Sequence, residues 1–361
     1  MKIKKIKLLH YRNYEKLELD FSSTLNLIYG DNGSGKTNLI EAIYLLALTK
    51  SFRTSNDFNM IKSNSNQTTV TGEIDDIKYQ IEIFDGGKKV YIDNDKIDKL
   101  SKYIGQINLI LFNPLDTKVI TDSPATRRRM LDIEISQISQ DYLIILANYN
   151  RILKHRNAYL KQLFLNGNSS GEYLDILTKK LIEYGVKIYE IRDNYIKQIN
   201  DNITKIYENI FNYGNLTIKY HSDYSNKNVD KLLKMYQKNY KKEMAYGKTL
   251  EGIHHDDIEF MLDEHNIKIY GSIGQQKNSI ISFKLAELLI IKKIKGEYPI
   301  LILDDLFSEL DNNKVNNILK MLNKEVQTFI TTTNIESIQD ELIKDGTLFK
   351  VNYGSIERKD L

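Results

Sequence analysis

The segment from Gly30 to Thr37 restricts this chain more than any other part of its sequence. It reads Gly-Asp-Asn-Gly-Ser-Gly-Lys-Thr and matches the phosphate-loop pattern G-x-x-x-x-G-K-[ST] without a mismatch. An apolar run at 25–29 precedes it and helix-compatible residues at 38–48 follow, which is the strand–loop–helix order that the pattern requires. We therefore expect the chain to bind a nucleoside triphosphate. A glycine turn that matches by chance is the alternative.

Each part of this segment has an expected task in holding phosphate. Glycines allow the loop to wrap closely round phosphate oxygens, and successive backbone N–H groups at the start of the helix point at the anion. Lys36 is expected to reach the β- and γ-phosphates, and the Thr37 hydroxyl is expected to hold Mg²⁺. The ATP contacts predicted in this loop are Gly30, Asp31, Asn32, Gly33, Ser34, Gly35, Lys36 and Thr37.

A second short segment supplies the acids that a nucleotide site needs. Four apolar residues at 300–303 lead into Asp304 and Asp305, as in a parallel strand that is buried on both faces. We expect Asp304 to bind Mg²⁺ opposite Thr37, usually through water, and Asp305 to orient or deprotonate the attacking water. Two acids at a buried strand end are costly unless a cation or hydrogen bonds compensate them, which disfavours a purely structural role. The predicted catalytic residues are Lys36, Asp304 and Asp305.

Charge is distributed unevenly along the chain. The whole chain has 51 Lys and Arg against 48 Asp and Glu, a net charge of +3. Residues 219–248 contain eight lysines and three acids, whereas residues 299–361 contain eleven acids and seven basic residues. This segregation suits a polyanion that lies on one part of the surface, although a solvated lysine-rich face would explain the run equally well.

Several classes of protein are excluded by what the sequence lacks. Because there is no cysteine, neither a disulfide framework nor a thiolate metal site is possible. The basic start at 1–7 has no apolar core behind it, so no signal peptide is expected. No run of about 18 uncharged apolar residues could span a membrane. We expect a soluble, cytoplasmic protein.

Hydrophobic patterns divide the chain into a strand-rich start, a helical middle and a mixed end. The strands expected before residue 125 lie at 3–8, 14–21, 25–29, 68–74, 78–84, 88–93 and 107–112. Apolar residues spaced by three and four positions, from Leu131 to Leu163 and from Leu174 to Ile203, predict two long helices. A turn at 166–171 joins them into an antiparallel hairpin, and a third helix at about 228–244 carries the lysines.

The strand pattern resumes after this helical insertion. Residues 267–270 are expected to form a strand, and an apolar helix should follow at 279–294. Buried strands are expected at 300–303 and 327–331, with a helix between them. The predicted parts are therefore 1–125, with the phosphate loop and a β meander, 126–248, the helical arm, and 249–361, the rest of the nucleotide-binding head.

Two further segments narrow the class of nucleotide site. Residues 272–276, Ser-Ile-Gly-Gln-Gln, begin the long helix that precedes the 300–303 strand, and residues 308–311, Ser-Glu-Leu-Asp, follow Asp305 closely. The first resembles the signature loop of ABC-type ATPases and the second resembles their D-loop. In that family the signature serine and glycine donate to the γ-phosphate that the other subunit binds. Ser272, Gly274 and Gln275 are therefore expected ATP contacts.

A single copy of each of these motifs implies two half-sites, which are completed when two chains meet face to face. The predicted fold is α/β. It is an ABC-type ATPase head with a mixed sheet and a phosphate loop, into which an α-helical hairpin arm is inserted.

The chain resembles one family in particular, the RecF family of bacterial DNA replication and repair ATPases, which is related to Rad50 and the SMC heads. The matching segments run nearly from end to end and lie at 9–14, 30–42, 112–116, 123–132, 272–277 and 303–311. One departure lies at 252–257, where Ile253 and His255 replace the proline and arginine of the pattern Gly-Pro-His-Arg-Asp-Asp. If that arginine contacts phosphate or an acid, His255 would do so only when protonated.

The resemblance implies an ATP-driven homodimer on double-stranded DNA or gap junctions, released by slow, DNA-stimulated hydrolysis. It also implies Arg12 and Asn13 as ATP contacts, Mg²⁺ as the metal, and the mediators RecR and RecO as partners that help to load the recombinase RecA. The expected DNA contacts are Arg127, Arg128, Arg129, Lys238, Lys241 and Lys242. For the three arginines, pairing with acids at the junction of head and arm is the alternative.

Other ATPase classes fit the sequence less well. A transporter subunit places its signature about a hundred residues after the lysine, whereas Lys36 and Ser272 are 236 positions apart. A Rad50 or SMC protein needs a far longer coiled coil. Only 50 residues follow Asp311, which leaves no room for the nuclease of some phage-defence ATPases. A related phage-defence ATPase and a catalytically silent, ATP-gated DNA clamp stay open as alternatives.

Overall fold

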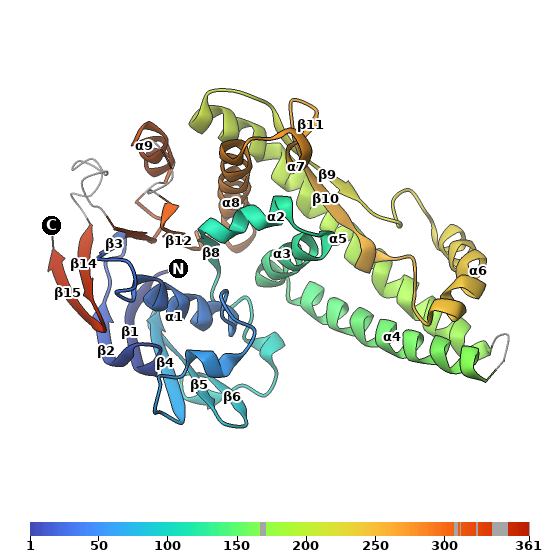
Figure 1. The fold of residues 1–361 in the computed structure, drawn as a ribbon, viewed down its shortest axis with the longest axis horizontal. Helices are drawn as coiled ribbons and strands as arrows, with labels where there is room; N and C mark the ends of the chain where they lie inside the picture. Colours follow the sequence, from blue (N-terminus) through green and yellow to red (C-terminus); the bar gives the residue numbers. More distant parts are fainter. Residues whose placement is uncertain (167–170, 307–309, 311, 323, 334–345, 361) are drawn as a thin grey trace. The chain divides into compact units, whose positions relative to one another are not determined.

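The computed structural model describes residues 1–166, 171–306, 310, 312–322, 324–333 and 346–360. The chain forms two compact units, each assembled from separate stretches of sequence (Figure 1). The first unit comprises Met1–Thr117, Lys205–Tyr213 and Lys277–Leu361, and the second comprises Lys118–Thr204 and Gly214–Gln276. The three-part division at residues 125 and 248 stays a prediction about the functional parts of the chain.

One sheet of the first unit is built almost entirely from parallel strands. Its order is β15-β14-β3-β13-β12-β8, and only β15 runs antiparallel to its neighbour. The strands are β3 (Leu25–Tyr29), β8 (Leu109–Phe112), β12 (Ile300–Asp304), β13 (Thr328–Thr332), β14 (Thr347–Asn352) and β15 (Ser355–Asp360). Every residue of β8, β12 and β13 is buried, as expected for parallel strands covered on both faces. Because β3 pairs with both β13 and β14, strands from the two ends of the chain lie side by side.

The second sheet of the first unit is antiparallel throughout, in the order β2-β1-β4-β5-β6-β7. Its strands are β1 (Ile3–Tyr11), β2 (Tyr14–Asp20), β4 (Gln67–Ile74), β5 (Ile77–Phe84), β6 (Gly87–Ile92) and β7 (Asp95–Lys96). Buried and more exposed residues alternate along β4 and β5, as they do in a sheet with one face on the core. This sheet contains the β meander that the sequence predicts.

Helix α1 (Lys36–Leu48) is in contact with both sheets of the first unit. It touches β1, β4 and β5 of the antiparallel sheet and β8, β12 and β13 of the parallel sheet. Ten of its thirteen residues are buried, which is typical of a helix that is apolar on nearly all sides. The start of α1 is therefore fixed relative to the ends of the neighbouring parallel strands.

The remaining elements of the first unit are short or continue into the second. They are η1 (Asp57–Met60), η2 (Leu100–Lys102), η3 (Pro114–Thr117), α9 (Asn312–Met321), most of α8 (Ile273–Lys295) and the end of α5 (Glu172–Phe211). None of the helices in the described part of the chain is long and apolar enough to cross a membrane.

The second unit combines helices with a small sheet, in the order β11-β10-β9. Its helices are α2 (Lys118–Thr121), α3 (Pro124–Ile138), α4 (Gln140–Leu165), most of α5, α6 (Val229–Tyr246), η4 (Ile253–His255) and α7 (Ile267–Tyr270). Its strands are β9 (Leu216–His221), β10 (Asp257–Leu262) and β11 (His265–Asn266). Helices α4 and α5 lie side by side in Figure 1 and share a buried cluster of Leu160, Leu163 and Leu174. The predicted helical hairpin is thus present.

Two sequence-based expectations for the second unit were wrong. The first long helix is interrupted at Ser139, which is extended (φ −135°, ψ 105°) and whose hydroxyl accepts a hydrogen bond from the Tyr142 amide at 3.1 Å. Residues 267–270 form helix α7 instead of a strand, because the Asn266 side chain caps the helix by accepting a bond from the Lys268 amide. Strands β9 and β10 were not expected at all.

The one charged residue in the apolar seam of α4, Arg156, forms a buried ion pair. Its Nη2 lies 2.6 Å from Glu243 Oε2 of α6, and the two side chains are 1% and 0% exposed. Its other nitrogens donate to the hydroxyls of Thr178 at 3.0 Å and Thr249 at 2.7 Å. The pair therefore joins α4, α5 and α6 inside the second unit.

We predict that Glu243→Ala lowers the free energy of unfolding by about 3–5 kcal/mol, because it leaves the Arg156 guanidinium buried without a counter-charge. Denaturant unfolding measured by circular dichroism tests this. The matched control is Glu183→Ala, which removes an exposed pair with Lys187 and should change stability little. Equal stability of the Glu243 variant and the wild type would contradict a structural role for the pair.

Candidate nucleotide-binding site

The loop between β3 and α1 has the backbone that a phosphate-binding loop requires. Gly30 and Gly35 have φ angles of 153° and 119°, values that other residues rarely adopt. A Cβ atom on Gly30 would lie 2.4 Å from the Val351 carbonyl oxygen, and one on Gly35 would lie 2.6 Å from Asn13 Nδ2. Only glycine fits at these two positions.

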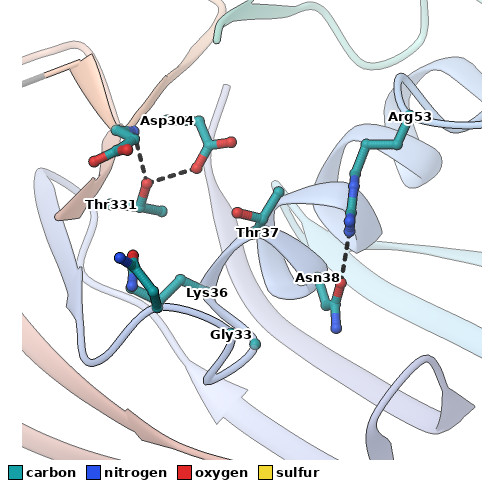
Figure 2. A pocket seen from close by; sticks show the side chains of 10 residues that line it. Gly33, Lys36, Thr37, Asn38, Arg53, Asp304 and Thr331 are labelled. Carbon is teal, nitrogen blue, oxygen red and sulfur yellow. Dashed lines mark hydrogen bonds between the residues drawn. The ribbon is translucent and has the colours of Figure 1, made fainter. Parts of the chain in front are cut away.

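A cavity of about 310 Å³ lies over this loop (Figure 2). It is lined by Asn32, Gly33, Gly35, Lys36, Thr37, Asn38, Arg53, Asp304, Asp305 and Thr331, all from the first unit. The lysine and threonine of the phosphate loop and both acids of β12 are thus brought to one cavity, although more than 260 residues separate them in sequence.

Lys36 is held against the loop by its own backbone. The Nζ atom donates to the carbonyl oxygens of Gly30 at 2.6 Å and Asp31 at 2.9 Å. Burial lowers the pKa of Lys36, and the nearby charges of Asp305 and Asp304 oppose this shift. The ammonium group therefore lies beside the cavity, where a bound anion would further favour the charged form of Lys36.

Thr331 of β13 links the two acids of the site. Its hydroxyl donates to Asp304 Oδ1 at 2.6 Å and accepts a bond from the Asp305 amide at 2.9 Å, as Figure 2 shows for the residues it labels. Asp304 is only 5% exposed, and burial raises its pKa, while the bond from Thr331 opposes the rise. Thr331 was not among the site residues predicted from the sequence, because the pairing of β12 with β13 brings it to the cavity.

Arg53 is a second lining residue that sequence reasoning missed. It follows α1 in a segment without a recognisable motif, and its side chain is 42% exposed. Its Nη1 donates to Asn38 Oδ1 at 2.8 Å, a contact visible in Figure 2. Arg53 therefore places a second positive charge at the cavity, at the end away from Asp304 and Thr331.

Arg12 and Asn13, expected as direct ATP contacts, support the loop and are not among the residues that line this cavity. Arg12 donates through Nε and Nη2 to both carboxylate oxygens of the buried Glu41, at 2.8 and 2.7 Å. Asn13 donates to the Ser34 carbonyl at 3.2 Å and accepts a bond from Asn38 Nδ2 at 2.8 Å. Both residues connect the β1–β2 turn to α1 and its loop.

The signature segment lies in the second unit at the start of α8. The Ser272 amide donates to Gln275 Oε1 at 2.8 Å, and the Gln275 amide donates to the Ser272 hydroxyl at 3.2 Å. This reciprocal pair is a capping box, which accounts structurally for the spacing of the two residues. Ser272, Ile273 and Gly274 are exposed. Of the expected D-loop, residues 308, 309 and 311 lie outside the described residues.

The three arginines predicted to contact DNA lie in different environments on α3. Arg127 is 5% exposed and pairs through Nε and Nη2 with both oxygens of Asp257, at 2.6 and 3.0 Å. Its guanidinium is buried and paired with an acid, as in the alternative that the sequence left open, so Arg127 is not part of the DNA surface proposed below. Arg128 donates to the Asp256 carbonyl at 2.7 Å, and Arg129 is exposed.

The lysines of α6 lie on its exposed side. Lys238, Lys241 and Lys242 are exposed, as are Lys231 and Lys234, whereas the buried side of the helix contains Leu232, Tyr236 and Glu243. Glu243 is paired with Arg156, so it does not neutralise the exposed lysines. The helix thus presents a basic face.

Comparison with known proteins agrees with this arrangement. Residues 2–107 match the family model of the RecF/RecN/SMC N terminal domain. DNA replication and repair protein RecF of Enterococcus faecalis is 39% identical to this chain over 99% of both proteins. The RecF protein of Bacillus velezensis is also 39% identical, over 99% of this chain and all of its own length.

Solved structures of RecF proteins also match this chain over nearly its whole length. Two structures of the recombination mediator protein RecF in the RecFOR pathway, one named with ATP, have TM-scores of 0.89 and 0.90 and identities of 32% and 31%. Each covers 99% of this chain and 97% of its own. An Smc head domain from Pyrococcus furiosus has a TM-score of 0.57 at 17% identity, which reflects the shared fold alone. With such identity over nearly its whole length, the chain belongs to the RecF family and has the α/β fold of an ABC-type ATPase head.

Proposed function

We propose that this protein is an ATP-dependent DNA-binding ATPase of recombinational repair and replication restart. The observation that carries the proposal is the cavity at which Lys36, Thr37, Asp304 and Asp305 meet, because these are the groups that phosphoryl transfer needs. The relatives named above support the DNA-repair part of the proposal, since they are DNA replication and repair proteins.

Mg²⁺ is the metal that suits the oxygen atoms at this cavity. Thr37 supplies a hydroxyl and Asp304 a carboxylate, and hard divalent cations prefer such ligands. A cation there would also compensate the buried Asp304, whose pKa is raised by burial. When bound, Mg²⁺ would neutralise charge on the β- and γ-phosphates.

The residues of the chain would share the work of hydrolysis. Lys36 binds the β- and γ-phosphates, and Asp305 orients the attacking water and accepts its proton. Thr331 holds Asp304 and the backbone of Asp305 in place through its single hydroxyl. Arg53 adds positive charge at the other end of the cavity. Arg12 and Asn13 act as positioning residues, through Glu41 and the loop backbone.

ATP would bring two copies of the protein together. Ser272 and Gly274, exposed at the start of α8, donate to the γ-phosphate bound at the partner's loop, and Gln275 fixes the Ser272 turn. ATP favours the dimer because it contacts both halves, and loss of the γ-phosphate removes that preference. Dimer formation is thus coupled to the state of the nucleotide.

The basic face of α6 is the proposed DNA-binding surface, together with Arg129 and the partly exposed Arg128. Lysine contacts to phosphate position a duplex without reading its sequence. Double-stranded DNA or a junction at a gap is therefore the proposed substrate. We also propose that the protein acts with the mediators RecR and RecO, as its relatives in the RecFOR pathway suggest.

Replacement of Lys36 by alanine should abolish ATP binding and ATP-induced dimerisation together, because the phosphates lose their main cationic contact. Isothermal titration calorimetry and light scattering with and without ATP measure the two effects. Ser272→Ala is the matched control, since it should retain ATP binding while losing the dimer. ATP-driven dimers of the Lys36 variant would refute the composite site.

Asp305→Asn should retain ATP binding and lower the rate of phosphate release at least about a hundredfold, because an amide is a poor proton acceptor. Phosphate release is measured with and without duplex DNA. If the wild type itself released no phosphate under either condition, the chain would instead be the catalytically silent, ATP-gated DNA clamp.

Charge reversal at Lys238, Lys241 and Lys242 should weaken duplex binding and reduce its salt dependence. The slope of log K against log salt should fall by about 0.9 for each phosphate contact that is lost. Fluorescence anisotropy across a salt titration measures both quantities. Reversal of the exposed Lys89, Lys96 and Lys99 in the first unit changes the net charge equally and serves as the control. Equal losses for both triple variants would remove α6 from the proposed surface.

A further inference from the structure

The cavity over the phosphate loop suits phosphates and a cation, but not the base of a nucleotide. Its ten lining residues are polar, charged or glycine, and none of them has an aromatic ring. Figure 2 shows Asp304 and Thr331 at one end of the cavity and Asn38 and Arg53 at the other. Since the acids take the γ-phosphate and Mg²⁺, the nucleoside leaves the cavity at the Asn38 end.

The hairpin formed by β14 and β15 lies against the phosphate loop. The Val351 carbonyl is so close to Gly30 that a Cβ atom there would lie 2.4 Å away, and a Cβ atom on Gly354 would lie 3.1 Å from the Asn13 carbonyl oxygen. Asn13 in turn accepts a bond from Asn38 at the cavity wall. A continuous path of contacts thus runs from the nucleoside end of the cavity to the turn of this hairpin.

An aromatic residue occupies the first position of that turn. Tyr353 and Gly354 connect the paired residues Asn352 and Ser355, and both have positive φ angles, of 38° and 97°. Turns with positive φ at both central residues favour Asn, Asp or Gly, and a bulky side chain there is uncommon. The Tyr353 side chain is nevertheless 75% exposed, so packing in the core does not account for it.

Three other hairpins of this chain show what the turn ordinarily contains. The two-residue turns that join β4 to β5, β6 to β7 and β10 to β11 also have positive φ at both positions. Their first residues are Asp75, Asp93 and Asp263. Among these four turns, only the one between β14 and β15 contains an aromatic residue. The turn conformation itself therefore does not explain the Tyr353 ring.

We propose that the Tyr353 ring stacks against the base of the nucleotide bound at the phosphate loop. The inference rests on the proposed nucleotide binding and deepens it, because it assigns the base contact that the lining residues lack. Every nucleobase has an aromatic face, so this contact would add affinity without selecting strongly among purines.

Binding of ATP, ADP and inorganic tripolyphosphate to the wild type, Tyr353→Asn and Tyr353→Phe tests the proposal by calorimetry. Asparagine suits the turn, so the Tyr353→Asn variant should be at least as stable as the wild type in thermal unfolding. It should bind ATP and ADP about five- to tenfold more weakly and tripolyphosphate equally well. Tyr353→Phe should bind all three ligands as the wild type does.

The controls separate this inference from its rivals. ADP lacks the γ-phosphate, so a loss of ADP affinity does not come from a weakened dimer. An equal loss for tripolyphosphate would mean that the variant distorts the loop, and unchanged ADP binding by Tyr353→Asn would mean that the ring does not touch the base. Either result overturns the inference alone. Failure of the wild type to bind any of the three ligands would overturn the nucleotide site as well.

Discussion

The site depends on how closely the backbone of the phosphate loop can be approached. Gly30 lies against the Val351 carbonyl of β14 and Gly35 lies against the Asn13 side chain, so the loop is packed between segments from the two ends of the chain. Any Cβ atom at either position would push these segments away and change the direction of the backbone N–H groups. Because those groups are the proposed phosphate ligands, the proposed site needs the pairing of β3 with β14 and the β1–β2 turn as well as the lysine.

Charge balance is the second constraint on the cavity. Burial shifts the pKa values of Asp304 and Lys36 in the directions that favour their neutral forms, and the charge of each residue opposes the shift of the other. Hydrogen bonds from Thr331 and to the Gly30 carbonyl hold these groups in place before any ligand arrives. In the proposed function, a triphosphate would bring negative charge to Lys36 and a divalent cation would bring positive charge to Asp304, so each would favour the charged form of its neighbour.

Sequence reasoning succeeded where a site is built from neighbours in the chain. The segment Gly30 to Thr37 and the acids at the end of β12 were identified because strand, turn and helix follow one another within each. It missed Thr331 and Arg53, which reach the cavity through strand pairing and through a loop without a motif. It left open whether Arg127 contacts DNA or pairs with an acid, because the partner Asp257 is 130 positions away. Hydrophobic spacing alone missed the break between two helices at Ser139, and it predicted a strand where Asn266 caps a short helix.

The contacts around His255 show what surrounds the position where the family pattern has arginine. Both acids that follow it already have arginine partners, since Asp256 pairs with the buried Arg192 at 2.8 Å and Asp257 pairs with Arg127 at 2.6 Å. His255 is exposed, so its charge is not needed to compensate either acid. The neighbouring His254 bonds to the Tyr149 hydroxyl at 2.8 Å, and burial lowers its pKa to about 4, which keeps it neutral near pH 7. Asp256 and Asp257 therefore each have an arginine counter-charge without a cation at position 255.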